Sequence, residues 1–198
     1  MLRELRPALS LVVLFTLVLG LIFPVAVTGL AQLALPFQAN GSLILVGGKP
    51  VGSALIGQTF TSPTLFQSRP SALTGTDAKG ATVPTPYDAS ESGASNLAST
   101  SKAMIDDVGT RVAAYRRAFG PGPVPADAVE SSGSGLDPDI SLVNALRQAP
   151  AVAAARHLPA ASVIALVNQM ATRPWLGFVG TAHVNVLELN VALGSKQG

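Results

Sequence analysis

The sequence has no cysteine and only two histidines, His157 and His183. A chain without cysteine has no disulfide, thiol nucleophile, cysteine-ligated zinc or iron–sulfur cluster. The two histidines are predicted at a helix end and just before a strand or helix, where a surface or capping role is favoured over that of a general base. This inventory favours a binding or structural role over redox or metal chemistry.

Charge is scarce as well, because only 12% of the 198 residues are charged, about half the share in a soluble globular protein. No charged residue lies between Pro7 and Gly48. The net charge is +2, and Arg116 and Arg117 are the only adjacent basic residues. Nucleic-acid binding needs clustered Lys and Arg, so no nucleic-acid partner is expected.

The uncharged run from Ala8 to Leu30 is nearly all apolar, and about 20 such residues in a helix cross the hydrocarbon of a bilayer. Arg3 and Arg6 precede this run, and positive residues favour the cytoplasmic side. We therefore expect a cytoplasmic N-terminus at 1–7, a single transmembrane helix at 8–31 and an extracytoplasmic domain at 32–198, in the cell inner membrane. The alternative, a cleaved secretory signal, has a shorter apolar core and a small-residue cleavage site that is missing here.

Beyond the apolar run, turn residues and apolar periodicity predict a mixed α/β domain. Residues 63–100 are rich in Ser, Thr, Pro and Gly, and they predict a long irregular stretch anchored by Phe60, Phe66 and Tyr87. The tail at 184–193 fits both a strand and a helix. The other predicted elements are a hairpin at 43–56, a helix at 102–119, and a helical region at 142–147, 151–156 and 160–172 that Pro150 and Pro159 break.

Two loops have residues suited to binding an anion. Gly133, Ser134 and Gly135 resemble a phosphate-cradling loop, but a tight turn before a helix is the favoured interpretation, with Asp137 capping that helix. Residues 92–96 offer hydroxyls and an amide, which are also ordinary loop residues. The nucleophile pattern G-x-S-x-G is absent, so no serine hydrolase site is indicated.

Seven short motifs, taken together and in this order, resemble the KdpC family, the C subunits of bacterial potassium-transporting Kdp ATPases. The resemblance runs from residue 5 to residue 193 and agrees with one N-terminal membrane helix followed by a large outer domain. The motifs are Leu5–Leu9, Gly52–Gln58, Arg69–Ala72, Tyr87–Asp88, Ser92–Leu97, Ser132–Pro138 and Val184–Leu187.

The resemblance implies a non-catalytic accessory subunit of a P-type pump that imports potassium with ATP hydrolysed by another subunit. Its implied partners are a channel-like subunit, the ATP-hydrolysing subunit and a small membrane peptide. It implies no cofactor bound by this chain itself, since ATP and potassium enter through the complex. The implied roles are to hold the two large subunits together and to act as a catalytic chaperone that raises the affinity for ATP.

The resemblance also suggests site residues. The candidates for a subunit interface are Gln58, Arg69, Ser132, Gly133, Ser134, Gly135 and Asp137, and those for a nucleotide contact are Ser92, Gly93, Ser95 and Asn96. The family commonly has a glycine in place of Ala94 and a histidine in place of Asp139, whose carboxylate would repel an anion. If the domain lies outside, it is separated from cytoplasmic ATP, and an effect on nucleotide affinity would be transmitted as a coupling; direct contact of ATP with Ser92, Gly93 and Ser95 is the alternative. The alternative function is a membrane-anchored extracytoplasmic binding protein or hydrolase.

Overall fold

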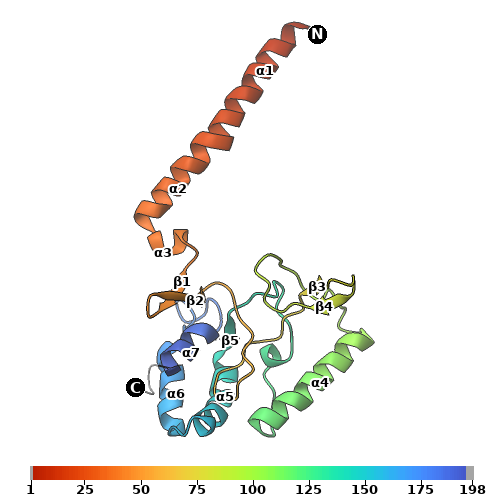
Figure 1. Cartoon of the computed structure of the whole chain (residues 1–198), viewed down its shortest axis with the longest axis vertical. Helices are drawn as coiled ribbons and strands as arrows, with labels where there is room; N and C mark the ends of the chain where they lie inside the picture. Colours follow the sequence, from red (N-terminus) through yellow and green to blue (C-terminus); the bar gives the residue numbers. More distant parts are fainter. Residues whose placement is uncertain (1, 195–198) are drawn as a thin grey trace. The chain divides into compact units, whose positions relative to one another are not determined.

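The computed structural model describes residues 2–194. The chain divides into two compact units, Met1–Leu43 and Ile44–Gly198. Figure 1 shows a first unit made of helix and a second unit that mixes helices with short strands. The predicted class, an N-terminal apolar helix followed by a mixed α/β domain, is confirmed at this level.

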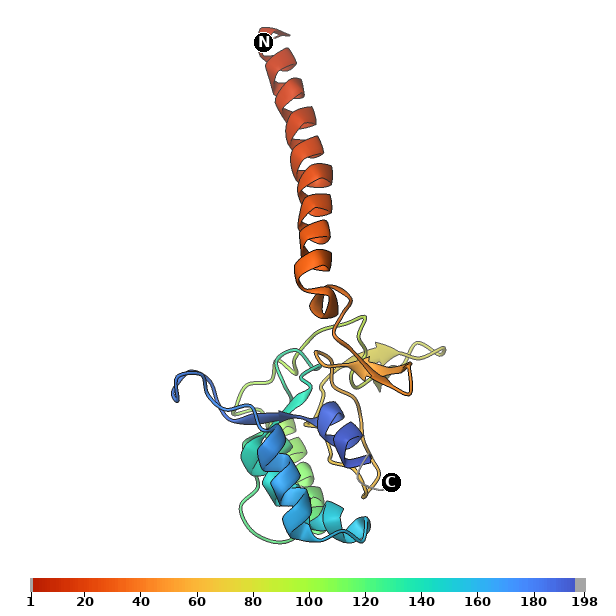
Figure 2. The same cartoon turned by 90° about the vertical axis from the view of Figure 1, so that its left-hand side faces the viewer.

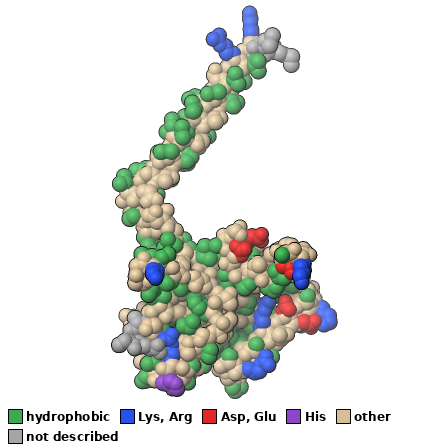
Figure 3. Space-filling view, viewed as in Figure 1, with side chains coloured by type: hydrophobic (Ala, Val, Ile, Leu, Met, Phe, Trp, Pro, Cys, Tyr) green, Lys and Arg blue, Asp and Glu red, His purple; other side chains and the backbone are tan. Residues whose placement is uncertain are grey.

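The first unit consists of α1 (Leu2–Leu17), a π-helical turn η1 (Val18–Ile22), α2 (Phe23–Ala34) and the short α3 (Pro36–Ala39). The helix over Arg3–Ala34 has 32 residues and is long and apolar enough to cross a membrane. Apolar side chains cover it in Figure 3. The π-helical turn lies just before Pro24, which has no N–H for a helical hydrogen bond. The Ser10 hydroxyl donates to the Arg6 carbonyl at 2.9 Å, as expected for a hydroxyl in an apolar helix.

Among the described residues the strands form three two-stranded sheets, and the predicted hairpin at 43–56 is one of them. It pairs β1 (Leu43–Val46) with β2 (Lys49–Ser53) around two glycines of positive φ. A second hairpin, β3 (Thr74–Thr76) with β4 (Thr82–Pro84), lies within the stretch predicted as irregular. The third sheet joins distant segments, because β5 (Asp139–Ser141) pairs antiparallel with β6 (His183–Asn185).

The helices of the second unit correct one prediction. α5 (Leu142–Ala155) runs unbroken through Pro150, although a break was expected there. Pro150 is exposed, whereas Ala149, Val152 and Ala153 around it are buried, so core packing on both sides of the proline keeps the helix continuous. The break at Pro159 is confirmed, because this residue is the N-cap of the next helix. The other helices are α4 (Lys102–Phe119), the short 3-10 helix η2 (Ala126–Ala128), α6 (Ala160–Met170) and α7 (Val186–Gly194).

The tail at 184–193, whose sequence fitted both a strand and a helix, contains part of a strand and a helix. Residues 183–185 form β6, and α7 begins directly at Val186. Val184, Val186 and Leu189 are buried with α5 and α6 in the core. The buried apolar residues of the tail are divided between a strand and the helix that follows it. Neither the strand period nor the helix period therefore extends over the whole segment.

Two buried amides attach the irregular stretch to this core. The Asn190 side chain accepts a hydrogen bond from the Phe66 amide at 2.8 Å and donates to the Phe66 carbonyl at 3.0 Å. Gln148 bonds the amide and carbonyl of Gln67 in the same way, at 2.7 and 3.1 Å. These side chains act like a neighbouring strand and let Phe66 be fully buried in a segment without secondary structure.

Candidate functional site

The residues predicted for a subunit interface come together in a set of loops of the second unit. We define the loop junction as residues 57–58, 68–71, 87, 92–93 and 132–137. Its segments are far apart in the sequence, and hydrogen bonds between them hold it together. All seven interface candidates lie within it.

Arg69 and Asp137 form the ion pair of the loop junction. The Arg69 Nη1 donates to the Asp137 Oδ2 at 2.7 Å, and the two side chains are 21% and 30% exposed. The second carboxylate oxygen of Asp137 accepts from the Asp139 amide at 3.0 Å. Asp137 does not cap α5, contrary to the prediction, because that helix begins at Leu142 and the Ser141 side chain caps it. The short strand β5 separates the aspartate from the helix.

The Ser132–Gly135 segment is a tight turn closed by its own side chains. The Ser132 hydroxyl accepts from the Gly135 amide at 2.9 Å, and the Ser134 hydroxyl accepts from the Leu136 amide at 3.1 Å. Gly135 has a φ of +71°, and a Cβ there would lie 2.6 Å from the Leu73 Cγ. The Ser71 hydroxyl donates to the Gly135 carbonyl at 2.8 Å. The favoured interpretation of this segment as a tight turn is therefore confirmed, and the hydroxyls of Ser132 and Ser134 close the turn.

Tyr87 connects three parts of the loop junction. Its hydroxyl donates to the Arg69 carbonyl at 2.6 Å, and burial raises the pKa of this phenol to about 12. A Cβ at Gly57 would collide with the Tyr87 ring, and the Gly57 amide donates to the Leu136 carbonyl at 2.8 Å. A side chain at position 57 would therefore push the ring away from the turn.

Gln58 joins the first hairpin to the loop junction. Its side-chain amide donates to the Val51 carbonyl at 2.8 Å. The backbone carbonyl of Gln58 accepts from the Ser68 hydroxyl at 2.7 Å. A Cβ at Gly52 would clash with this side chain. The absence of a side chain at Gly52 thus lets the side chain of Gln58 lie against the backbone of β2.

The four candidates for a nucleotide contact lie in different surroundings. The Ser92 hydroxyl and the Gly93 amide donate to the Ser134 carbonyl at 3.2 and 2.9 Å, so both groups point into the loop junction. Asn96 is exposed at a φ of +53°. Ser95 lines a separate cleft. These four residues do not converge on a common point for a phosphate.

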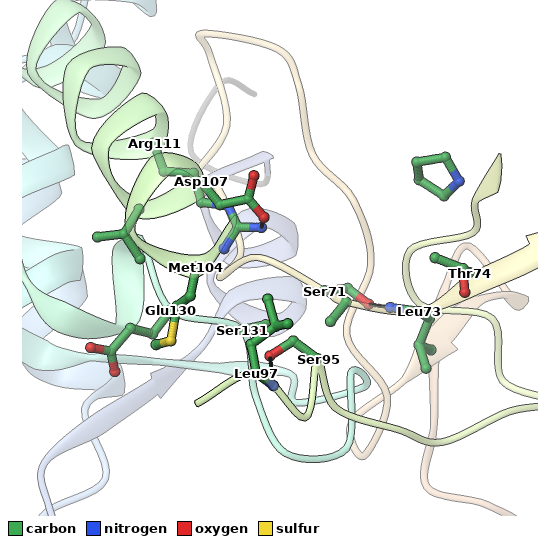
Figure 4. A pocket seen from close by; sticks show the side chains of 13 residues that line it. Ser71, Leu73, Thr74, Ser95, Leu97, Met104, Asp107, Arg111, Glu130 and Ser131 are labelled. Carbon is green, nitrogen blue, oxygen red and sulfur yellow. Dashed lines mark hydrogen bonds and ion pairs between the residues drawn. The ribbon is translucent and has the colours of Figure 1, made fainter. Parts of the chain in front are cut away.

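Two clefts lie along α4, on either side of Arg111, a residue that the sequence patterns did not single out. The first has a volume of about 390 Å³ and contains Ser95, Met104 and Arg111 (Figure 4). The second has a volume of about 440 Å³ and contains Arg69, Tyr87 and Arg111. The Arg111 guanidinium donates to the Val129 carbonyl at 3.0 Å. Arg111 follows Met104 and Val108 at helical spacing on α4, and a charged residue in this otherwise apolar row is the signal that the sequence offered.

Asp139 is a partly buried carboxyl group two residues beyond the loop junction. Burial raises the pKa of Asp139, opposed by His183, whose Nε2 lies 3.7 Å from the carboxylate. Within residues 2–194, no three His, Cys, Asp or Glu side chains are grouped so that they could hold a metal ion.

The described residues thus combine an N-terminal helix that is long and apolar enough to cross a membrane with a folded α/β domain organised by one loop junction. The family model for KdpC, the K⁺-transporting ATPase c chain, matches residues 5–195. The chain therefore belongs to the KdpC family.

Several curated relatives are similar over nearly their full lengths. The potassium-transporting ATPase KdpC subunit of Allorhizobium ampelinum is 50% identical over 193 residues, which cover 98% of this chain and 96% of the relative. The KdpC subunit of Caulobacter vibrioides is 52% identical over 198 residues, covering 99% and 95%. That of Methylobacterium nodulans is 49% identical over the whole of both chains. The resemblance inferred from the seven motifs is thereby confirmed.

Proposed function

We propose that this chain is the non-catalytic assembly subunit of an ATP-driven potassium importer of the inner membrane. In this proposal residues 8–31 span the bilayer, residues 1–7 lie in the cytoplasm and residues 32–198 lie outside. The outer domain holds the channel-like and ATP-hydrolysing subunits together, in the presence of a small membrane peptide subunit. Family membership and the long apolar helix support this proposal.

The observation that carries the proposal is the internal use of polar groups in the loop junction. Arg69 pairs with Asp137, and Ser71, Ser132 and Ser134 bond to the backbone of the same loops. A ligand-binding or hydrolytic site keeps polar groups available for its substrate, whereas a docking surface needs a fixed shape. The loop junction fits the second requirement, with Gln58 and the 132–137 turn as its contact residues.

We also propose that any effect on the affinity for ATP is a coupling between states of the complex. The Ser92 hydroxyl and the Gly93 amide are occupied by the Ser134 carbonyl, which supports an indirect effect over direct contact. Direct contact through Ser92, Gly93, Ser95 and Asn96 would require this loop to open.

Co-purification of the tagged full chain from potassium-starved cells tests the proposal. We expect both large subunits to elute with the wild-type chain at a fixed ratio, and Arg69→Gln to lower their recovery severalfold because Asp137 loses its partner. The matched control is Lys102→Gln, which breaks the exposed Lys102–Asp106 pair on α4 and should leave recovery unchanged. Recovery of the wild-type chain alone and in good yield would overturn the assembly role and favour an independent binding protein or hydrolase.

The same preparations test the coupling. A complex with Gln58→Ala, purified in lower yield because a contact residue is truncated, should keep its subunit ratio and show a raised KM for ATP with a smaller change in kcat. Cross-linking of a photoreactive ATP analogue to residues 92–96 would show direct contact and contradict the coupling proposal.

A further inference from the structure

The segment between α6 and β6 carries an exposed apolar tip, which we define as residues 175–179. Four of its five residues have large apolar side chains that are well exposed: Trp175 at 71%, Leu176 at 65%, Phe178 at 78% and Val179 at 47%. Figure 2 shows this segment extending away from the helices of the second unit. Contiguous exposed apolar side chains of this size mark an interaction site in a folded protein.

The apolar tip has a defined backbone structure. Trp175 and Val179 exchange two backbone hydrogen bonds, both at 2.9 Å, and Thr172 and His183 exchange two more at the base, at 2.9 and 3.1 Å. Gly177 has a φ of +81°, and Leu176 has a φ of +53° although it is not a glycine. The fold therefore holds the apolar side chains outward in a closed turn.

The stretch of sequence that contains the apolar tip carries charge of one sign. From Ile140 to Leu187 the sequence contains no Asp or Glu, whereas Arg147, Arg156 and Arg173 lie in this span. Arg173 is the one of these that adjoins the apolar tip in the sequence, two residues before Trp175. At the base of the tip, the Asp139 carboxylate lies 3.7 Å from His183 Nε2. A cationic segment with an apolar end is complementary to an anionic lipid surface.

The chain length keeps the second unit near a bilayer that contains the apolar helix. Helix α2 ends at Ala34 and the second unit begins at Ile44, so nine residues, 35–43, join them. An extended chain of nine residues reaches at most about 30 Å. The apolar tip therefore belongs to a domain that cannot leave the vicinity of the membrane surface.

We propose that the apolar tip inserts into the interfacial layer of the adjacent lipid leaflet and binds anionic phospholipid. Trp175 lies at headgroup level, as interfacial tryptophans do, with Leu176 and Phe178 deeper and Arg173 at a lipid phosphate. This second membrane contact limits rotation of the domain about its linker. The inference rests on the membrane anchoring in the proposed function.

Trp175 is the only tryptophan of the chain, so its fluorescence reports on the apolar tip alone. The full chain is reconstituted in vesicles of phosphatidylcholine and phosphatidylglycerol, with or without acyl chains brominated near the carbonyl. We expect bromination to cause a loss of Trp175 emission, and phosphatidylglycerol to shift the emission to shorter wavelength than pure phosphatidylcholine does. Unquenched emission from a chain that co-sediments with the vesicles would overturn the inference and leave the anchoring intact. Failure to co-sediment would overturn both.

Variants separate insertion from general effects on the fold. Phe178→Ser and Arg173→Gln should each reduce the quenching severalfold, with an unchanged far-ultraviolet circular dichroism spectrum. The matched control is Ile105→Ser, which removes another exposed apolar side chain, 58% exposed on α4, and should leave the quenching unchanged. Shielding of Trp175 from aqueous acrylamide only after the partner subunits are added would identify the occupant as protein and overturn lipid insertion.

Discussion

At the residue scale, two glycines of the 132–135 turn differ in what their positions tolerate. Gly135 has a φ of +71° and lies against Leu73, whereas Gly133 has open space around its Cα and no positive φ. Gly135→Ala should lower the free energy of unfolding by more than about 1 kcal/mol, and Gly133→Ala should change it by less than about 0.5 kcal/mol. Denaturant unfolding of both variants in the same detergent checks this. Equal losses would show that the turn does not need the left-handed conformation.

The buried phenol of Tyr87 predicts a loss of stability in alkali. Its pKa is raised from 10.0 to about 12 because burial disfavours the phenolate. The folded state therefore holds a proton that the unfolded chain releases, so this contribution is full below pH 10 and is lost as the pH rises through about 12. Unfolding free energies measured across that range should fall less steeply for Tyr87→Phe. An unchanged slope would show that the phenol ionises equally in both states.

Tyr115 is an internal comparison for this titration. Burial also raises its pKa to about 12, and it donates to the Asn144 side chain. Tyr115→Phe should lessen the slope as Tyr87→Phe does, and the double variant should lessen it further. The sequence marked Tyr87 as an anchor, but its environment depends on Gly57 and Arg69, which only folding places beside it.

At the element scale, α5 and α7 hold the irregular stretch through Gln148 and Asn190. Replacing Asn190 by Ala removes both hydrogen bonds to Phe66 and leaves its buried backbone groups without these partners. The expected loss of unfolding free energy is about 2–4 kcal/mol. Hydrogen exchange at the Phe66 amide should accelerate more than exchange within α6. Asn168→Ala, on the exposed side of α6, is the control and should leave both quantities nearly unchanged.

Element types were predictable where local periodicity is strong. The 18 residues of α4 match the predicted range because Ser101 and Gly120 bound the pattern. The predicted break at Pro150 was wrong. The low helix propensity of proline is a local property, whereas the burial of Ala149 and Val152 depends on packing against other helices. The irregular stretch could not be interpreted from periodicity, since its partners are the side chains of Gln148 and Asn190.

At the scale of the whole molecule, the apolar helix predicts how the chain partitions into membranes. Leu19 lies at the middle of the uncharged run, so Leu19→Arg should cost about 2.5–3.5 kcal/mol of insertion free energy. The carbonate-resistant membrane fraction should fall for this variant. Leu5→Arg, near the helix end, is the control because its side chain can extend to the interface. Equal fractions for both variants would contradict a span centred on this run.

The sequence by itself determined the features that depend on neighbouring residues: the long apolar helix, the first hairpin, α4 and the mixed composition of the domain. The seven motifs also identified the family, and both the match to the family model and the curated relatives confirm it. Tertiary structure alone decided how those motifs meet. Arg69 and Asp137 are 68 positions apart, and Phe66 and Asn190 are 124 apart. Such contacts depend on how the core closes, because no periodicity along the chain encodes which distant groups become partners.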